Sequence, residues 1–350
     1  MAVAYRRGAA RRRAASSARR QLLDEPTPAS RACYSASVDS GGERGVQEII
    51  EGVVRDIGRV LLGKDRQIRL ALCALFSRGH LLIEDLPGMG KTTLSHALAR
   101  ALGLGFTRVQ FTSDMLPGDI LGVSVFDQRA QAFSFHPGPV FTEVLLADEI
   151  NRSTPKTQSA LLEAMAERQV TIEGETRALP EDFFVIATQN PVTQAGTFPL
   201  PESQLDRFLM RIEIGYPDRA AERAMLAGAS AAPAIDRLAA TLTRDELRGI
   251  QREAQQVRTA EVLLDYVQRL IEYTRSAPEF AHGLSPRGAL ALVNSARTWA
   301  YMEGRAHVVP EDVQAVLPAV VAHRLCSTTD FSGDGRALVQ RLLSDVDVFD

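Results

Sequence analysis

One short segment, residues 80–103, constrains the fold more than any other part of the chain. An apolar run, Leu81-Leu82-Ile83, is followed by the Gly/Pro-rich turn EDLPGMG and by a helical pattern that begins at Lys91 and ends at Gly103. A buried strand, a tight turn and a helix in this order are typical of an α/β unit whose strand lies in a parallel sheet. The rest of the chain must therefore supply the neighbouring strands and the helices that cover them.

The sequence after this segment predicts four more strands, at residues 106–111, 142–150, 183–190 and 207–217. A helix is expected over residues 153–169, with Thr154 as its N-cap and Pro155 in its first turn. Two small β excursions are expected, one after Asp119 and one around Gly174. Because strands that alternate with helices predict a parallel sheet covered on both faces, the expected fold class is α/β.

The sequence after Pro217 predicts helices, so we expect the chain to consist of three parts. Residues 46–217 form the α/β core, residues 218–350 form an all-helical domain, and residues 1–45 form a basic segment rich in Arg, Ala and Ser. The basic segment is predicted to be disordered. A tail that binds an acidic partner, a transit peptide, and a start placed upstream of the true one remain as alternatives, and no function rests on it.

The composition narrows the class of protein. A formal net charge of −3 gives no electrostatic reason to expect nucleic acid as the main partner. The three cysteines have neither metal-site nor redox spacing, which favours a reducing, cytoplasmic location. No apolar run is long enough to form a transmembrane segment.

The turn between the first strand and its helix has the composition of a phosphate-binding loop. Gly88 and Gly90 let the backbone approach a phosphate closely, and the N–H groups at the helix start point toward it. Lys91 can reach the β- and γ-phosphates, and the Thr92 hydroxyl can ligate Mg²⁺. Asp85 stands where the usual pattern has its first glycine, and we expect it to be tolerated because aspartate accepts unusual backbone angles. For the isolated segment the alternative is a glycine-rich turn with a solvated lysine.

Polar residues at later strand ends support the first interpretation. Asp148 and Glu149 end the apolar strand VLLADE, at the edge where parallel sheets bind ligands. Asp148 can hold the Mg²⁺ shell, and Glu149 can activate water as a general base. Asn190 ends the next strand and can orient that water, although alone it would read as an Asn-Pro turn. Arg207 and Arg287 suit stabilisation of a phosphoryl group, although most arginines are surface residues.

Five segments together resemble the MoxR family of AAA+ ATPases, over about residues 46–330. They are LLIEDLPGMGKTTL, LPGDILGVSVFD, GPVFTEVLLADEINRSTPKTQSALLEAMAERQVTIEG, FFVIATQNPVTQAGTFPLPESQLDRFL and LSPRGALAL. The resemblance implies an AAA+ P-loop NTPase core with strand order 5-1-4-3-2, a helical lid, and ATP between them. It also implies a homo-oligomeric ring, usually a hexamer.

The resemblance further implies a role for each candidate residue. Asn190 corresponds to sensor 1, Arg287 to the lid arginine called sensor 2, and Arg207 to the arginine finger that reaches a neighbouring subunit's ATP. Arg152 is a weaker candidate for that contact. The implied catalytic residues are Glu149, Lys91, Asn190, Arg207 and Arg287. The implied ATP-binding residues are Gly63, which lies against adenine, and Pro87, Gly88, Met89, Gly90, Lys91, Thr92, Thr93, Asp148 and Arg287. The implied Mg²⁺ ligands are Thr92 and Asp148.

The function implied by the resemblance is Mg²⁺-dependent ATP hydrolysis that remodels or matures a client protein complex, in some cases by inserting a metal or cofactor. The implied partner carries a von Willebrand A domain, and the two β excursions match family insertions that face the ring pore or upper surface. A nucleic-acid motor is the first alternative, which the near-neutral charge disfavours. A chelatase-type motor subunit is the second, and only the client would distinguish it. A transcriptional activator is disfavoured because the chain lacks the GAFTGA loop.

Overall fold

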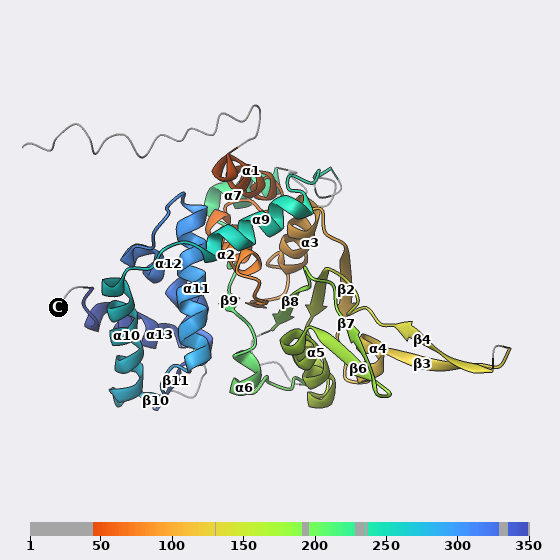
Figure 1. Ribbon diagram of the computed structural model, residues 1–350. Coiled ribbons are helices and arrows are strands. Elements are labelled where there is room, and N and C mark those ends of the chain that lie inside the picture. The colour runs from red at the N-terminus through yellow and green to blue at the C-terminus, as the bar shows by residue number, and fades with distance from the viewer. Residues whose placement is uncertain are drawn as a thin grey trace, which may run out of the picture. The chain divides into compact units, whose positions relative to one another are not determined.

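Five parallel strands form the central sheet of the molecule (Figure 1). The computed structural model describes residues 45–129, 131–190, 196–227, 235, 237–328 and 335–348. The strands are β1 (Leu81–Glu84), β2 (Phe106–Gln110), β5 (Val144–Asp148), β8 (Phe184–Gln189) and β9 (Met210–Ile212). Their spatial order is β2-β5-β8-β1-β9, and every pairing is parallel. Counted along the chain this order is 5-1-4-3-2, so the predicted fold class and strand order are confirmed.

Successive residues of a strand point to opposite sides, and in the central strands β5, β8 and β1 nearly all of them are buried, so both faces of these strands are covered. Leu81 and Ile83 pack into one apolar cluster with helices α1 (Val46–Gly58), α2 (Asp65–Phe76) and α3 (Lys91–Ala101). Leu82 packs into a second cluster with α5 (Pro155–Glu167) and the short helix α4 (Pro117–Leu121). The apolar runs that predicted the central strands are therefore the signature of strands with no solvent-facing side, whereas the edge strand β2 is partly exposed.

Side-chain caps fix where helices begin in both parts of the chain. Thr154 Oγ1 accepts a hydrogen bond from Thr157 N, and Pro155 occupies the first position of α5, as predicted. Helix α11 (Pro286–Met302) begins in the same way, with the Ser285 hydroxyl accepting from Gly288 N. Both helices therefore start where the local sequence dictates.

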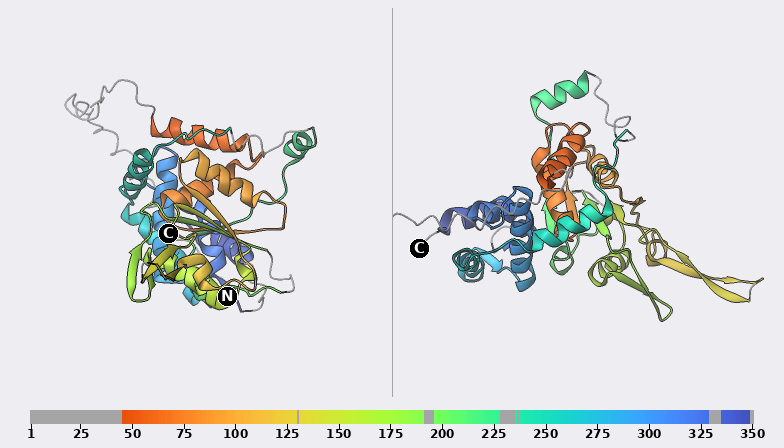
Figure 2. Two further views of the ribbon diagram at one scale, coloured as in Figure 1. Left: turned by 90° about the vertical axis from the view of Figure 1, so that its right-hand side faces the viewer. Right: turned by 45° about the horizontal axis from the view of Figure 1, so that its top comes forward.

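Two antiparallel hairpins project from the α/β part (Figures 1 and 2). The longer pairs β3 (Gly122–Asp127) with β4 (Ala132–Pro137), and the shorter pairs β6 (Gln169–Ile172) with β7 (Glu175–Ala178). They correspond to the two predicted β excursions. Helix α4 was not predicted, because five residues are too few to show helical periodicity.

Helices dominate the chain after β9. They are α7 (Arg219–Leu226), α9 (Arg244–Gln255), α10 (Glu261–Ser276), α11, α12 (Pro310–Val321), the 3₁₀ turn η3 (Ala322–Arg324) and α13 (Arg336–Asp345). The prediction that no strand follows Pro217 is wrong, because β10 (Phe280–His282) pairs with β11 (Cys326–Ser327). Strands of two and three residues carry no periodic signal. Among the described residues, no helix is both long and apolar enough to cross a membrane.

The helical part shares its core with the α/β part. The apolar cluster on the α2 face of the sheet also contains buried residues of α11 and α12. The described residues between 45 and 348 pack as one unit. The boundary predicted between residues 217 and 218 therefore marks a change in secondary structure. One continuous apolar cluster extends across it.

Candidate nucleotide-binding site

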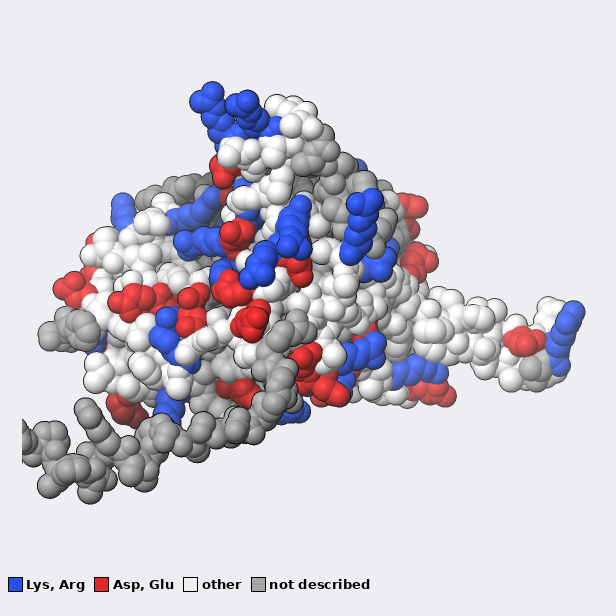
Figure 3. Space-filling model, turned by 90° about the horizontal axis from the view of Figure 1, so that it is seen from above, with Lys and Arg blue, Asp and Glu red and all other residues white. Residues whose placement is uncertain are grey.

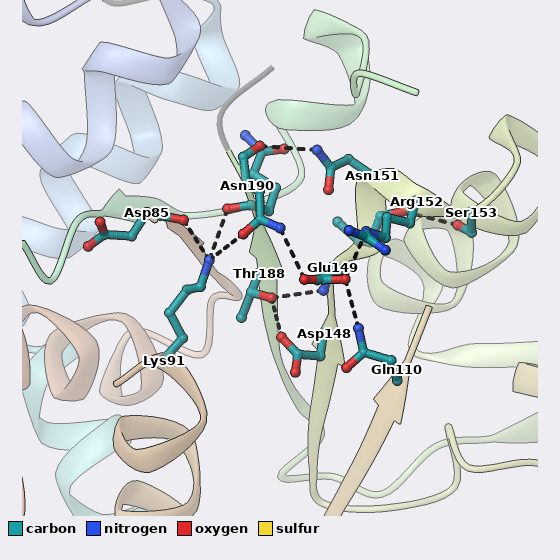
Figure 4. A network of polar contacts seen from close by, with 12 residues as sticks. Asp85, Lys91, Gln110, Asp148, Glu149, Asn151, Arg152, Ser153, Thr188 and Asn190 are labelled. Carbon is teal, nitrogen blue, oxygen red and sulfur yellow. Dashed lines mark hydrogen bonds and ion pairs between the residues drawn. The ribbon is translucent and has the colours of Figure 1, made fainter. Parts of the chain in front are cut away.

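Lys91 and the loop before it form one side of the candidate site (Figure 4). Gly88 and Gly90 have φ angles of +85° and +91°, which glycine adopts without a Cβ clash. They turn the chain from β1 into α3, and Lys91 opens that helix with 8% of its surface exposed. Its Nζ donates to Asp85 O at 2.6 Å and to Asn190 Oδ1 at 3.0 Å. Burial lowers the pKa of Lys91, which nearby carboxylates oppose. The ammonium group is thus surrounded by oxygen atoms, as a phosphate-binding lysine would be.

Asp85 has a structural task that explains why no glycine stands at this loop position. Its Oδ2 accepts hydrogen bonds from Ile214 N at 2.8 Å and Gly215 N at 2.7 Å, and its Oδ1 accepts one from Leu86 N at 2.7 Å. The carboxylate therefore ties the loop to the chain that follows β9. The backbone φ angle of Asp85 is not positive. Tolerance of unusual backbone angles is therefore not needed at this position, and the hydrogen bonds of the Asp85 side chain account for its presence.

Asp148 lies at the carboxyl end of β5, where donors from both neighbouring strands hold it. Thr188 Oγ1, on β8, donates to Asp148 Oδ1 at 2.6 Å. Arg108 Nη2, on β2, donates to Asp148 Oδ2 at 2.7 Å. The side chain is only 10% exposed. A fixed carboxylate is the ligand type that Mg²⁺ prefers, so Asp148 fits the predicted metal-binding role.

Glu149 follows Asp148 with a left-handed backbone, at φ +55°. This conformation is uncommon for a non-glycine residue and is often found at functional sites. A hydrogen bond from Glu149 N to Thr188 Oγ1, at 2.8 Å, holds it. Glu149 Oε1 accepts from Asn190 Nδ2 at 3.0 Å, whereas Oε2 accepts from Gln110 Nε2 at 2.9 Å and pairs with Arg152 Nε at 2.9 Å. Three side-chain donors therefore fix the carboxylate that was predicted to be the general base.

Asn190 joins the two sides of the site. Its Oδ1 accepts from Lys91, and its Nδ2 donates to Glu149 (Figure 4). Asn151 Nδ2 donates to the Asn190 backbone oxygen at 3.1 Å, which holds the strand end in place. The amide therefore lies between the candidate phosphate-binding lysine and the candidate base, where a sensor residue is expected.

Besides Asn151, three residues of this network that lie on strands were missed by sequence reasoning. Arg108 and Gln110 lie two residues apart on β2, and Thr188 lies within the buried strand β8. Each is a polar residue near the carboxyl end of a strand adjacent to β5, which was the signal available in the sequence. Their partners depend on which strands are neighbours and in what register, and residue spacing alone does not give that.

A pocket of about 420 Å³ adjoins the loop at Gly88 and Gly90. Its apolar lining comes from Val60, Leu61, Leu62, Met89, Pro217 and Met225. Gly63, predicted to lie against adenine, has φ +68° and stands between two residues of the lining. An apolar pocket beside backbone N–H groups suits a planar base whose phosphates extend along the loop.

The other predicted contacts of the loop differ in their surroundings. Thr93 lines the pocket together with Met89, whereas Pro87 is exposed in the turn. Thr92 is half-buried in the first turn of α3. Their roles stay predictions.

Arg207 lies away from this network, at the amino edge of the sheet. It follows α6 (Glu202–Leu205) and precedes β9, whose Met210 pairs with Leu81, the first residue of β1. Its Nη1 donates to Leu162 O at 2.9 Å. Because a strand rises about 3.3 Å per residue, the length of β1 alone separates this edge from the phosphate loop by about 10 Å. The structure therefore does not bring Arg207 to the loop of its own chain.

Arg287 also lies near the amino edge of the sheet. Burial lowers the pKa of His80, the residue before β1, to about 4, and the charges of Arg168 and Arg287 add to this shift. The neighbouring Gly288 packs against Arg324, because a Cβ added to it would lie 3.0 Å from Arg324 Cδ. The structure thus places Arg287 with Arg207 rather than with Lys91, whereas the resemblance implied that Arg287 contacts the phosphate of ATP held between core and lid.

Comparison with known proteins agrees with this geometry. The sequence matches the family described as "ATPase family associated with various cellular activities (AAA)" over residues 80–210, and the AAA lid domain over residues 272–342. It is 39% identical over 306 residues to "Chaperone MoxR1" of Mycobacterium tuberculosis, a match that spans 84% of this chain and 81% of that protein. The chain belongs to the MoxR family of AAA+ ATPases.

Two further relatives of this MoxR-family chain are matched over nearly the whole of their own length. YeaC of Bacillus subtilis, described as uncharacterized, is 42% identical over 298 residues, which span 84% of this chain and 93% of that protein. A protein from Cytophaga hutchinsonii, assigned as an ATPase and known from a crystal structure, is 34% identical to this chain in sequence. The two structures match with a TM-score of 0.77. That match covers 86% of this chain and 95% of the other.

Proposed function

We propose that this MoxR-family chain binds ATP and Mg²⁺ at the carboxyl edge of its sheet and hydrolyses the ATP. One observation carries the proposal. Lys91, Asn190 and Glu149 form a continuous chain of hydrogen bonds beside Asp148. A cation for phosphate, an amide that can orient water and a fixed carboxylate that can accept a proton therefore share one site.

Each residue has a task in this reaction. The loop N–H groups and Lys91 hold the phosphates, and the apolar pocket holds the base. Asn190 orients the attacking water, and Glu149 accepts its proton as the water oxygen bonds to the γ-phosphorus and the bond to the bridging oxygen of ADP breaks. Asp148 and Thr92 would hold Mg²⁺, which when bound neutralises charge on the phosphate oxygens.

The proposal includes a second copy of the chain. Arg207 and Arg287 lie at the opposite edge of the sheet, so we assign them to the ATP of a neighbouring subunit in a ring, with six subunits as the expected number. Arg152, the weaker candidate, pairs with Glu149 of its own chain. A fixed guanidinium supplied in trans stabilises charge on the transferring phosphoryl group.

The use of the ATP is proposed to be the remodelling of a client protein complex in the cytoplasm. The β3–β4 hairpin exposes Val123, Val125, Phe126 and Phe133. Figure 3 shows its stem without charged side chains, which gather at the tip. Exposed apolar surface of this kind suits a protein partner. A von Willebrand A domain partner and insertion of a metal or cofactor into the client are supported by the family resemblance.

Hydrolysis is tested by measuring phosphate release from ATP by the full chain. We expect turnover that requires Mg²⁺ and is lost in Lys91→Ala. Arg248→Lys, a change outside the site, is the matched control and should leave turnover within about twofold. Wild-type protein that forms assemblies but releases no phosphate with Mg²⁺ would contradict the proposal.

The client is tested with the Glu149→Gln variant, which should hold ATP without hydrolysing it. With ATP bound, the variant on an affinity column should retain a client and a von Willebrand A protein that Lys91→Ala does not retain. Strong stimulation of turnover by DNA would instead favour a nucleic-acid motor.

A further inference from the structure

Arg324, in the helical part, makes hydrogen bonds to the chain on both sides of Arg207. It ends η3, and only 5% of its side chain is exposed. Its Nε donates to Asp206 Oδ1 at 2.7 Å. Its Nη2 donates to Phe208 O at 2.6 Å, and its Nη1 donates to Leu209 O at 3.1 Å. One guanidinium therefore holds the residue before Arg207 and the two residues after it.

This set of bonds requires an arginine. A guanidinium has five N–H donors in a rigid planar arrangement, so it can bond a carboxylate and several carbonyl oxygens at fixed angles. Burial lowers the pKa of Arg324, and the Asp206 carboxylate opposes that shift. Because a buried charge is costly without its partners, the joint between η3 and residues 206–209 has one well-defined arrangement.

Two further contacts place this joint between the helical part and the arginine edge. His323 Nε2 lies 3.1 Å from Phe208 O and is buried. Gly288, which follows Arg287, packs against the Arg324 side chain. Arg324 therefore contacts the backbone that carries Arg207 and the helix start that carries Arg287.

We infer that Arg324 is a positioning residue that couples the helical lid to the direction in which Arg207 points. It fixes the backbone of residues 206–209, so a displacement of η3 displaces Arg207 as well. The inference rests on the proposed function, in which Arg207 acts on the ATP of a neighbouring subunit. Arg324 does not contact the phosphate loop of its own chain, so its loss should slow hydrolysis and leave ATP affinity unchanged.

Three variants test the inference in the full chain. Arg324→Lys keeps the charge but cannot bond all the acceptors, Arg324→Met removes the charge, and Asp206→Asn keeps the shape of the joint while weakening it. The matched control is Arg248→Lys, because Arg248 Nη2 also joins the helical part to a buried carboxylate, Asp182 Oδ2, at 2.8 Å. Its bonds do not involve residues 206–209.

We expect Arg324→Lys to lower kcat by about 10-fold to 100-fold, because small misplacements of a catalytic group have effects of this size. KM for ATP should stay within about twofold, and Asp206→Asn should show a smaller loss of the same kind. Adding excess Glu149→Gln subunits, which carry an intact arginine edge, should restore turnover to the Arg324→Lys subunits. A merely structural role would raise KM or resist this restoration.

Three results would overturn the inference. Arg324→Lys could keep normal kcat, or lose turnover that Glu149→Gln subunits do not restore, or share its loss with Arg248→Lys. If Arg207→Ala has full turnover in the same assay, the assignment of Arg207 itself fails. If Arg207→Ala is inactive while Arg324→Lys is fully active, the role of Arg324 alone is refuted.

Discussion

The two edges of the central sheet differ in how complete they are. At the carboxyl edge, Asn190 makes hydrogen bonds to both Lys91 and Glu149 within one chain, and neighbouring strands hold Asp148 in place. At the amino edge, Arg207 and Arg287 contact no phosphate-binding residue of their own chain among the residues described. Under the proposed function, one chain would carry the binding half of one site and the arginine half of another, an arrangement that a ring of identical subunits allows.

The largest expected effect comes from the amino edge. Arg207→Ala should lower kcat by about 1,000-fold, the scale of an arginine finger, because it removes a guanidinium that stabilises charge on the transferring phosphoryl group. ATP affinity, measured by equilibrium binding of a fluorescent analogue, should be unchanged. Arg207→Lys is the control for charge without the planar fork and should recover only part of the rate. Normal turnover in Arg207→Ala would move the finger elsewhere, with Arg152 as the next position to change.

The next effect belongs to the carboxyl edge. Glu149→Gln should lower kcat by about 100-fold or more, because the amide keeps the shape of the side chain but cannot accept the proton of the attacking water. The phosphate loop and Lys91 are unchanged in this variant, so ATP binding should survive. Single-turnover phosphate release measures the chemical step directly. A Glu149→Gln variant with wild-type turnover would refute its assignment as the base.

A change at Asp85 tests whether hydrogen bonds between distant parts of the chain hold the carboxyl edge together. Asp85→Ala removes the acceptor of Ile214 N and Gly215 N, so we expect about 2 kcal/mol less free energy of unfolding. Because Gly215 lines the pocket, KM for ATP should rise about 10-fold with little change in kcat. Asp127→Ala, at the hairpin tip, is the control. A variant with unchanged KM and unchanged urea midpoint would show that the tether is not required.

His80 gives the smallest effect and probes the amino edge without touching chemistry. Burial lowers its pKa to about 4 from 6.5, and its Nδ1 accepts a hydrogen bond from Val185 N at 3.0 Å. The unfolded chain therefore binds more protons between pH 6.5 and pH 4, so this contribution is complete above pH 6.5 and is lost as the pH falls through that window. The free energy of unfolding should drop by about 1 kcal/mol more between pH 7 and pH 5.5 in the wild type than in His80→Gln. Equal drops in urea unfolding would contradict this.

Much of the carboxyl edge could be predicted from the sequence. Lys91, Asp148 and Asn190 each follow or end a strand that is apolar enough to identify, and parallel strands bring their carboxyl ends to one edge. The strand order came from the family resemblance rather than from residue patterns.

What could not be predicted depends on contacts between distant residues. The partners of Asp85 are backbone groups 129 and 130 residues away. Gln110 reaches Glu149 only because β2 lies beside β5. Arg324 reads as an ordinary arginine at a helix end until η3 is placed against residues 206–209. The separation of Arg287 from the phosphate loop of its own chain required the structure for the same reason, whereas the resemblance already assigned Arg207 to a neighbouring subunit.

The claim that the site is completed by a neighbouring subunit is tested most directly by mixing two inactive variants. Arg207→Ala keeps an intact phosphate loop and base, whereas Glu149→Gln keeps an intact arginine edge. In a ring mixed at random from equal amounts of the two variants, about a quarter of the interfaces join the two intact halves, so turnover should return to about that fraction of wild type. Mixed assemblies, verified by native mass spectrometry, that stay as inactive as each variant alone would contradict the claim.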